Sequence, residues 1–150
     1  MTYAGRKRLG IDVTVTSTTQ QHELGLRVEL NNGNQYVYIK AGEALTAGNA
    51  VKLGALATYQ TVLHTTAATT TLVGIVETSI ANASYGFICV KGLVANCNLA
   101  TGVVATDPLV GSGTAGRMAK CAASDVNSAT VIALENEAAN AGDCYITSGM

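Results

Sequence analysis

Residues 72–91 read LVGIVETSIANASYGFICVK, and residues 130–150 read TVIALENEAANAGDCYITSGM. A shift of 58 positions places Glu77 on Glu135 and continues without a gap over both stretches. Further matching pairs at this shift are Val73 with Val131, Ala81 with Ala139, Asn82 with Asn140, Phe87 with Tyr145 and, upstream, Val51 with Leu109. A register that holds over so many positions indicates a duplicated β unit, although a sequence rich in Ala, Thr and Gly also matches itself easily.

Length and composition already limit the number of domains and the kind of core that the chain can form. At 150 residues the chain is long enough for one domain with a real core, whereas half of it would be marginal as an independent fold. Hydrophobic residues make up 48% but aromatic residues only 5%, so small and β-branched side chains must build the core. Such a core buries less apolar area per residue, which leaves room for subunit contacts as a further source of stability.

The sequence divides near residue 34 into an N-terminal arm and a β domain. Within residues 1–34, polar residues dominate, and only IDVTVT and LGLRVEL alternate apolar with polar side chains. The NNGN sequence of residues 31–34 predicts a turn, because Asn and Gly accept positive φ at low cost. We expect an extended arm or hairpin up to this turn and a β domain over residues 35–150. Duplicated units would occupy about residues 36–91 and 95–150.

Alternation and β-branched content predict strands throughout the β domain. The expected strands cover residues 35–40, 49–54, 72–78, 85–94, 130–136 and 143–148. The only proline, Pro108, lacks a backbone donor and therefore marks a strand start or an edge. Turn signals recur about every eight to twelve residues, and helical periodicity is almost absent. The predicted fold class is all-β: a small β-barrel or sandwich built from two similar β units, with an extended N-terminal arm.

Charge and cysteine content limit the kinds of binding partner and the cellular compartment that we expect for this chain. Charged residues make up 13% and the net charge is −1, so nothing electrostatic favours nucleic acid or an anionic membrane as a partner. No apolar run approaches the roughly 20 residues of a membrane helix, and the start lacks the apolar stretch of a secretory signal. The cysteines form no CxxC pair, so we expect no metal or cofactor, a reducing cytoplasm and small buried thiols. The four are Cys89, Cys97, Cys121 and Cys144.

Side chains that could carry catalysis are few. His22 lies in a polar stretch and His64 at a strand end, and neither has a nucleophile or metal ligand at a recognisable spacing. Glu77 and Glu135 could be the acid and base of a glycosidase. They occupy equivalent repeat positions, however, and a residue that ends a strand and caps the next turn explains both. The turns concerned contain Asn82 and Asn140, which fit positions of Asx turns or positive φ. We therefore do not expect an enzyme.

Three segments carry a resemblance to a known family. They are an AGEALTAGNAVKL loop and strand at residues 41–53, a VGIV strand with its Ala-rich turn at residues 73–90, and a VIALE segment at residues 131–146. Over roughly residues 36–147 the chain resembles the small capsid decoration, or cement, proteins of tailed bacteriophages. The resemblance implies a homotrimeric structural virion protein on the outer capsid surface, made in the host cytoplasm. It implies that the protein clamps neighbouring major capsid protein subunits and thereby stabilises the head.

In proteins of this kind an N-terminal extension often supplies a strand or hook to the shell. The resemblance therefore directs attention to residues 1–34, where no motif match is seen. The candidate capsid-binding residues are a basic cluster and the apolar positions after it: Arg6, Lys7, Arg8, Ile11, Val13 and Val15. The basic cluster could equally be a solvated tail. An arm that docks on an acidic protein surface would gain order there, and three arms on one trimer would raise the effective concentration.

Two other classes stay open as alternatives. A surface-displayed carbohydrate- or receptor-binding β module of a phage particle would need exposed aromatic platforms. The chain has no Trp, and its candidates are Tyr36, Tyr38, Tyr59 and Tyr85. A trimeric β enzyme that hydrolyses nucleotides would need acidic and basic groups arranged for metal and phosphate, and the sequence shows no such arrangement.

Overall fold

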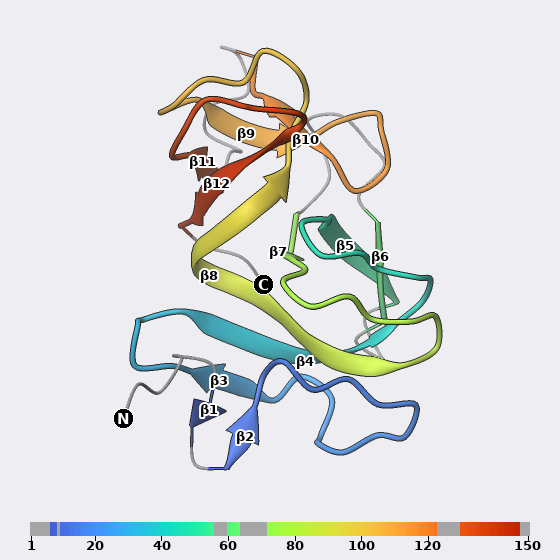
Figure 1. The fold of residues 1–150 in the computed structure, drawn as a ribbon. Coiled ribbons are helices and arrows are strands. Elements are labelled where there is room, and N and C mark those ends of the chain that lie inside the picture. The colour runs from blue at the N-terminus through green and yellow to red at the C-terminus, as the bar shows by residue number, and fades with distance from the viewer. Residues whose placement is uncertain (1–6, 9, 56–59, 64–71, 123–129, 148–150) are drawn as a thin grey trace.

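The computed structural model describes residues 7–8, 10–55, 60–63, 72–122 and 130–147. These residues form β-strands and no helix, so the predicted all-β class is confirmed for the described part of the chain (Figure 1). Three residues named above, Arg6, Tyr59 and His64, lie outside the described residues, as does the threonine-rich stretch at residues 65–71.

The strands agree well with the pattern of alternation. In chain order they are β1 (Lys7–Arg8), β2 (Ile11–Asp12), β3 (Arg27–Glu29), β4 (Gln35–Ala41), β5 (Ala50–Ala55), β6 (Gln60–Leu63), β7 (Gly74–Ile75), β8 (Tyr85–Asn98), β9 (Pro108–Gly111), β10 (Met118–Lys120), β11 (Val131–Ala133) and β12 (Ala141–Ile146). Each of the six strands predicted for the β domain overlaps an observed one, and Pro108 begins β9. Strands β6 and β10 lie outside the predicted ranges, and β8 is longer than expected.

Ten of the strands form one hydrogen-bonded sheet, in the order β10-β9-β11-β12-β8-β7-β5-β6-β4-β3. Strand β8 pairs in addition with β4, so the order β4-β8-β7-β5-β6 returns to β4 through its parallel pairing with β6. At the other end of the sheet, the isolated parallel bridge from Leu99 to Met118 links the residue after β8 with β10. Strands β1 and β2 form a small sheet of their own.

Strand β8 connects two halves of this sheet. Its residues 85–91 pair with β4 and β7, and its residues 92–98 pair with β12. We call β4 to β7 with the first half of β8 the first unit, and the second half of β8 with β9 to β12 the second unit. Figure 1 shows β8 running from beside β4 at its start to beside β12 at its end.

The described part of the predicted arm folds onto the body. Strand β3 pairs with β4 as a hairpin, and the NNGN turn between them has Gly33 at a φ of 86°. Further back, Ser17 exchanges two backbone hydrogen bonds with Tyr85. Val13, Val28 and Leu30 are buried in the main core. The predicted boundary at residue 34 therefore falls inside a hairpin, and residues 10–34 belong to the body because their apolar side chains cover one face of β4 and β8.

Two hydrophobic clusters sit on opposite faces of the first unit. The smaller cluster contains Val37, Ile39, Leu45, Val51, Val76, Ile80, Ile88 and Val90 with their neighbours. The larger cluster joins the other face of the first unit to the N-terminal residues and to the inner face of the second unit. Strands of the first unit are thus covered on both sides, whereas strands of the second unit contribute to a core on one side.

Equivalent contacts recur in the two units with changes of register. The N–H of Gly48 donates to the carbonyl of Val76, and the N–H of Thr106 donates to that of Ala133. The donors are 58 residues apart, whereas the acceptors are 57 apart. The single predicted shift of 58 is therefore wrong for the later strands: the shift is 57 at β11, and it is 56 at β12, where Tyr145 pairs with Ile132 as Cys89 pairs with Ile75. Glu77 then corresponds to Leu134, not to Glu135.

Candidate functional site

The predicted capsid-binding residues are placed in three different environments. Lys7 and Arg8 form β1 of the two-stranded hairpin. Ile11 is half-buried and packs against the main core, Val13 is buried within it, and Val15 is 55% exposed. Val13 is therefore a core residue, and the three apolar residues of the alternating IDVTVT stretch do not all face the same way.

A turn made by Asp12 explains this difference. Its Oδ1 accepts hydrogen bonds from the backbone N–H of Thr14, at 3.0 Å, and from the Thr14 hydroxyl, at 2.6 Å. The backbone N–H of Val15 donates to the Asp12 carbonyl. These local bonds compete with strand pairing, so β2 ends at Asp12 and alternation stops. Val13 consequently turns inward while Val15 stays in solvent.

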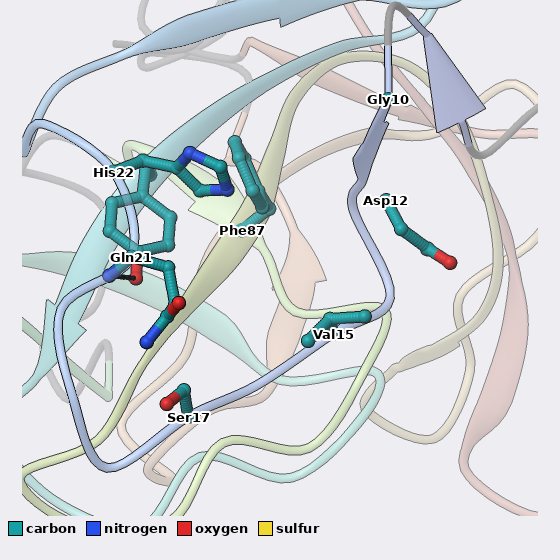
Figure 2. Close-up of a pocket in the computed structure, with 8 residues that line it drawn as sticks. Gly10, Asp12, Val15, Ser17, Gln21, His22 and Phe87 are labelled. Atoms are coloured by element: carbon teal, nitrogen blue, oxygen red, sulfur yellow. Dashed lines mark hydrogen bonds between the residues drawn. The ribbon is translucent and has the colours of Figure 1, made fainter.

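A pocket of about 210 Å³ lies between this turn and the sheet (Figure 2). Figure 2 shows His22 beside Phe87, with Gly10, Asp12 and Val15 across the opening. The His22 ring centroid lies 5.1 Å from that of Tyr38 and 5.7 Å from that of Phe87. His22 therefore packs on the aromatic residues of β4 and β8, where it helps to hold residues 10–22 on the sheet. The lining residues also include Ser17 and Gln21.

The two glutamates considered as a catalytic pair make unrelated contacts. Glu77 Oε2 accepts a hydrogen bond of 2.6 Å from the hydroxyl of buried Tyr36. Burial, and then the hydrogen bond to Glu77, raise the pKa of the Tyr36 phenol, so it stays a donor at neutral pH. Glu135 Oε1 accepts from the backbone N–H of Asp143 instead, at 3.0 Å. Glu77 thus ties a side chain of β4 to the segment that follows β7, and Glu135 caps the turn before β12.

The two units also differ in which turn residue has a positive φ. Asn140 has a φ of 63°, as predicted for a residue at positive φ. In the first unit the equivalent residue is Ala83, with a φ of 61°, and not Asn82. The change of the shift from 58 to 57 accounts for this difference.

Asn34 holds the point where the two units meet. Its side-chain amide donates to the carbonyl of Leu93 and accepts from the N–H of Leu93, at 2.8 and 3.1 Å. Gly92 lies directly against it at a φ of 112°, and a Cβ at this position would overlap the Asn34 side chain. The turn before β4 is thereby bonded to β8 at the residue where β8 passes from one unit to the other. The sequence marked Asn34 only as a turn residue.

All four cysteines are free and buried, as predicted. Burial, and then the charge of Glu77, raise the pKa of the Cys89 thiol to about 12. A hydrogen bond with Cys144, and then burial, raise the pKa of Cys97 well above its usual range. The Cys89 and Cys97 thiols therefore stay protonated at neutral pH, and all four cysteines serve as small packing residues. The part of the chain that the structure describes contains no cluster of three or more His, Cys, Asp or Glu able to hold a metal ion.

Of the tyrosines considered as platforms for a glycan site, the three that the structure describes are buried or half-buried. Tyr36 and Tyr38 are each only 2% exposed. Tyr85 is half-buried and stacks on Tyr38 with the ring centroids 6.2 Å apart. The two tyrosines of β4 are thus core residues, because the N-terminal segment covers them.

The outer face of the second unit carries an exposed apolar row. One residue from each of four neighbouring strands lies opposite the next, and the row consists of Pro108, Ile132, Tyr145 and Leu93. Ile132 is 38%, Tyr145 40% and Leu93 49% exposed. Leu134, two residues after Ile132, is also exposed. This face thus presents neighbouring apolar side chains from three strands to solvent.

The first unit has the same row in a buried state. It consists of Ala50, Ile75, Cys89 and Tyr36, paired across β5, β7, β8 and β4. None of these side chains is more than 2% exposed. They belong to the cluster that includes Val13, Val28 and Leu30 of the N-terminal segment. The exposed row was not predicted from the sequence, because alternation shows that a strand has two faces but not which faces are covered.

Acidic side chains gather at one end of the exposed row. Asp143 Oδ1 accepts from the backbone N–H of Asn96 at 3.0 Å, and Glu137 Oε1 accepts from that of Asn140 at 2.6 Å. With Glu135 they lie around the turn between β11 and β12. These carboxylates are thus held by backbone donors beside the apolar row and not within it.

No family model matches this sequence, and a search of curated proteins finds no match. Among the described residues, no helix has the length and apolar character needed to cross a membrane.

Proposed function

We propose that this chain is a structural virion protein that binds the outer surface of a bacteriophage capsid and clamps neighbouring major capsid protein subunits. The observation that carries the proposal is the N-terminal end of the molecule. There, the basic residues Lys7 and Arg8 lie on a hairpin that forms its own small sheet, next to the exposed side chain of Val15. An isolated two-stranded hairpin is marginally stable, so docking on a partner would add to its stability.

Attachment would combine charge and strand pairing. The basic hairpin would approach an acidic patch of the shell, and its strand edge could pair with a strand of the capsid protein. Several copies joined in one oligomer, a trimer by family resemblance, would engage several capsid subunits together. This multivalency would give tight attachment from individually weak contacts.

A finer description of the fold belongs to the same proposal. The closed pairing order of β4, β8, β7, β5 and β6 supports a small barrel in the first unit. The parallel bridge from Leu99 to Met118 in the second unit is equivalent in position to the parallel pairing of β4 with β6 in the first unit. We propose two duplicated barrel-like units that share β8. Such a body would be a rigid support for the hairpin.

Co-sedimentation tests the proposal. Empty, undecorated heads of the phage that encodes the chain are mixed with purified protein, and the pelleted fraction is measured. We expect saturable binding that weakens as ionic strength rises, because screening reduces the attraction of the basic hairpin. Protein that stays in the supernatant at all concentrations would contradict the proposal.

Two variants separate the hairpin from the rest of the surface. Deletion of residues 1–10 should reduce the pelleted fraction and leave the far-UV circular dichroism spectrum unchanged, because Val13 and β3 remain. The pair Lys7→Glu and Arg8→Glu should act in the same direction. Lys91→Glu is the matched control, since Lys91 is an exposed basic residue of β8 and not part of the hairpin. Equal loss in the control would show a general charge effect.

A further inference from the structure

We infer that Asn32, in the turn between β3 and β4, is a site of spontaneous covalent modification, at which the side-chain amide is lost and an aspartyl or isoaspartyl residue forms. The sequence contains one Asn-Gly pair, and it is Asn32 with Gly33. Such a pair is the most reactive context for this change, because glycine has no side chain to shield its backbone nitrogen. The inference goes beyond the proposed function and requires no partner.

The reaction needs only these two residues and water. The backbone nitrogen of Gly33 loses its proton and attacks the side-chain carbonyl carbon of Asn32, and the side-chain nitrogen leaves as ammonia. Water then opens the resulting five-membered succinimide ring at either of its carbonyl groups. One opening gives aspartate with the ordinary backbone. The other gives isoaspartate, in which the backbone runs through the former side chain and gains a methylene group. No electrons are transferred, so the reaction balances without an oxidant or a cofactor.

The turn presents Asn32 for this reaction. Asn32 and Gly33 are both exposed, and β3 before them is the last strand in the sheet order. Asn32 Oδ1 accepts a hydrogen bond from the backbone N–H of Asn34 at 3.0 Å, so the side chain folds back over the peptide group of Gly33. A Cβ at Gly33 would meet nothing within 4 Å, which leaves open space around the reacting atoms.

One hydrogen bond opposes the attack. The N–H of Gly33 donates to the carbonyl of Leu30 at 2.9 Å and must be released before its nitrogen can react. An exposed turn at a sheet edge opens locally at a small cost in free energy, so this bond slows the reaction without preventing it. Asn31 is the comparison within the same turn, because it is equally exposed but is followed by Asn32 instead of a glycine.

The two products should differ in their effect on the junction between the units. The Asn34 side chain donates to the carbonyl of Leu93 and accepts from its N–H. Aspartate at position 32 keeps the backbone and an oxygen that accepts from Asn34, so the junction should persist. Isoaspartate lengthens the turn two residues before Asn34. Because Gly92 lies directly against the Asn34 side chain, that side chain has little room to shift without losing Leu93.

Peptide mass spectrometry of the full chain, incubated at mildly alkaline pH, tests the modification. We expect the mass increase of amide-to-acid conversion at Asn32 and not at Asn31, with ammonia released in equal amount. Gly33→Ala should slow the conversion at least about tenfold, because the added methyl group shields the attacking nitrogen. This variant should still fold, since the added Cβ has open space.

A synthetic peptide of residues 29–36 shows the rate without the folded turn. A full chain that keeps its amide at Asn32 after the peptide has been converted would overturn the inference. So would conversion of Asn31 at the same rate, or an undiminished rate in Gly33→Ala.

Hydrogen exchange at the Leu93 N–H tests the effect on the junction. The isoaspartyl form, separated by ion exchange, should exchange this proton faster than the unmodified chain, because Asn34 no longer holds it. Asn32→Asp is the matched control: it carries the same added charge on an ordinary backbone and should leave the exchange unchanged. Equal exchange in the isoaspartyl form and in Asn32→Asp would show that the junction does not depend on this turn.

Discussion

The same cross-strand row is buried in the first unit and exposed in the second. In the first unit, Ala50, Ile75, Cys89 and Tyr36 lie in a core shared with the N-terminal segment. In the second unit, Pro108, Ile132, Tyr145 and Leu93 stand in the equivalent places with one face open. The difference teaches that strand pairing repeats with the local sequence, whereas burial depends on which other segment reaches each face.

The largest effect is expected for matched truncations in the two rows. Ile75→Ala should lower the free energy of unfolding by about 2–4 kcal/mol, since it leaves a cavity at a fully buried position. Ile132→Ala should cost less than about 1 kcal/mol in a dilute monomeric sample, because its side chain is partly in solvent already. Urea denaturation measures both. Equal losses would mean that the second row is covered in solution.

The junction between the units offers the next test. Gly92→Ala should cost about 2–3 kcal/mol, because a Cβ there meets the Asn34 side chain at a φ that L residues rarely adopt. Gly102→Ala is the control: its φ is 89° but nothing lies within 4 Å of the added Cβ. It should cost about 1 kcal/mol from backbone strain alone. Thermal unfolding measures the loss of stability in both variants. Equal losses would show that the contact with Asn34 adds nothing to the cost of placing an L residue at positive φ.

Replacing each of the two glutamates, Glu77 and Glu135, should give a smaller difference in the free energy of unfolding. Glu77→Gln should cost about 1 kcal/mol, because it replaces a charge-assisted hydrogen bond from buried Tyr36 by a neutral one. Glu135→Gln should change the free energy of unfolding by less than about 0.5 kcal/mol, since its partner is an exposed backbone donor. Chemical denaturation at neutral pH gives the comparison. A larger loss for Glu135 would be inconsistent with the contacts seen.

The smallest effect concerns acid stability. Lys120 Nζ lies 2.7 Å from Asp107 Oδ1, and the ammonium group holds the pKa of this carboxyl below its usual range. Because the pKa is lower in the folded state, the ionised carboxyl stabilises the fold above its unfolded value of about 3.9. That stabilisation is lost as the pH falls through the folded pKa. Asn49 holds the equivalent position in the first unit and does not titrate.

The variant Asp107→Asn therefore makes the second unit resemble the first. We expect the variant to be less stable than the wild type at neutral pH, where the ionised carboxyl stabilises the wild type, and to show a flatter decline of stability between about pH 5 and pH 2. Thermal melting across this range measures it. An unchanged acid limb would show that other carboxyl groups control the transition, and Glu135→Gln provides a second carboxyl for comparison.

Much of the local structure was predictable from short-range patterns. Alternating β-branched residues predicted the main strands, and the Asn-Gly turn before Gln35 is present. Strand β6 was missed because the YQTVLH stretch offers too few alternating positions for a confident pattern. Of the candidate binding residues, the sequence identified exposed Val15 but also named Val13, whose inward direction depends on the hydrogen bonds of Asp12. The exposed row was not predicted at all.

By itself, the sequence determined that the chain forms β-strands, where its turns lie, and that its cysteines pack as small apolar residues. These features follow from φ preferences and side-chain shape, which act within a few residues. The tertiary structure decided that Val13 is buried, that β8 serves both units and that Tyr145 faces solvent. The reason is that each strand has two faces, and only the path of distant segments determines which of them leaves water.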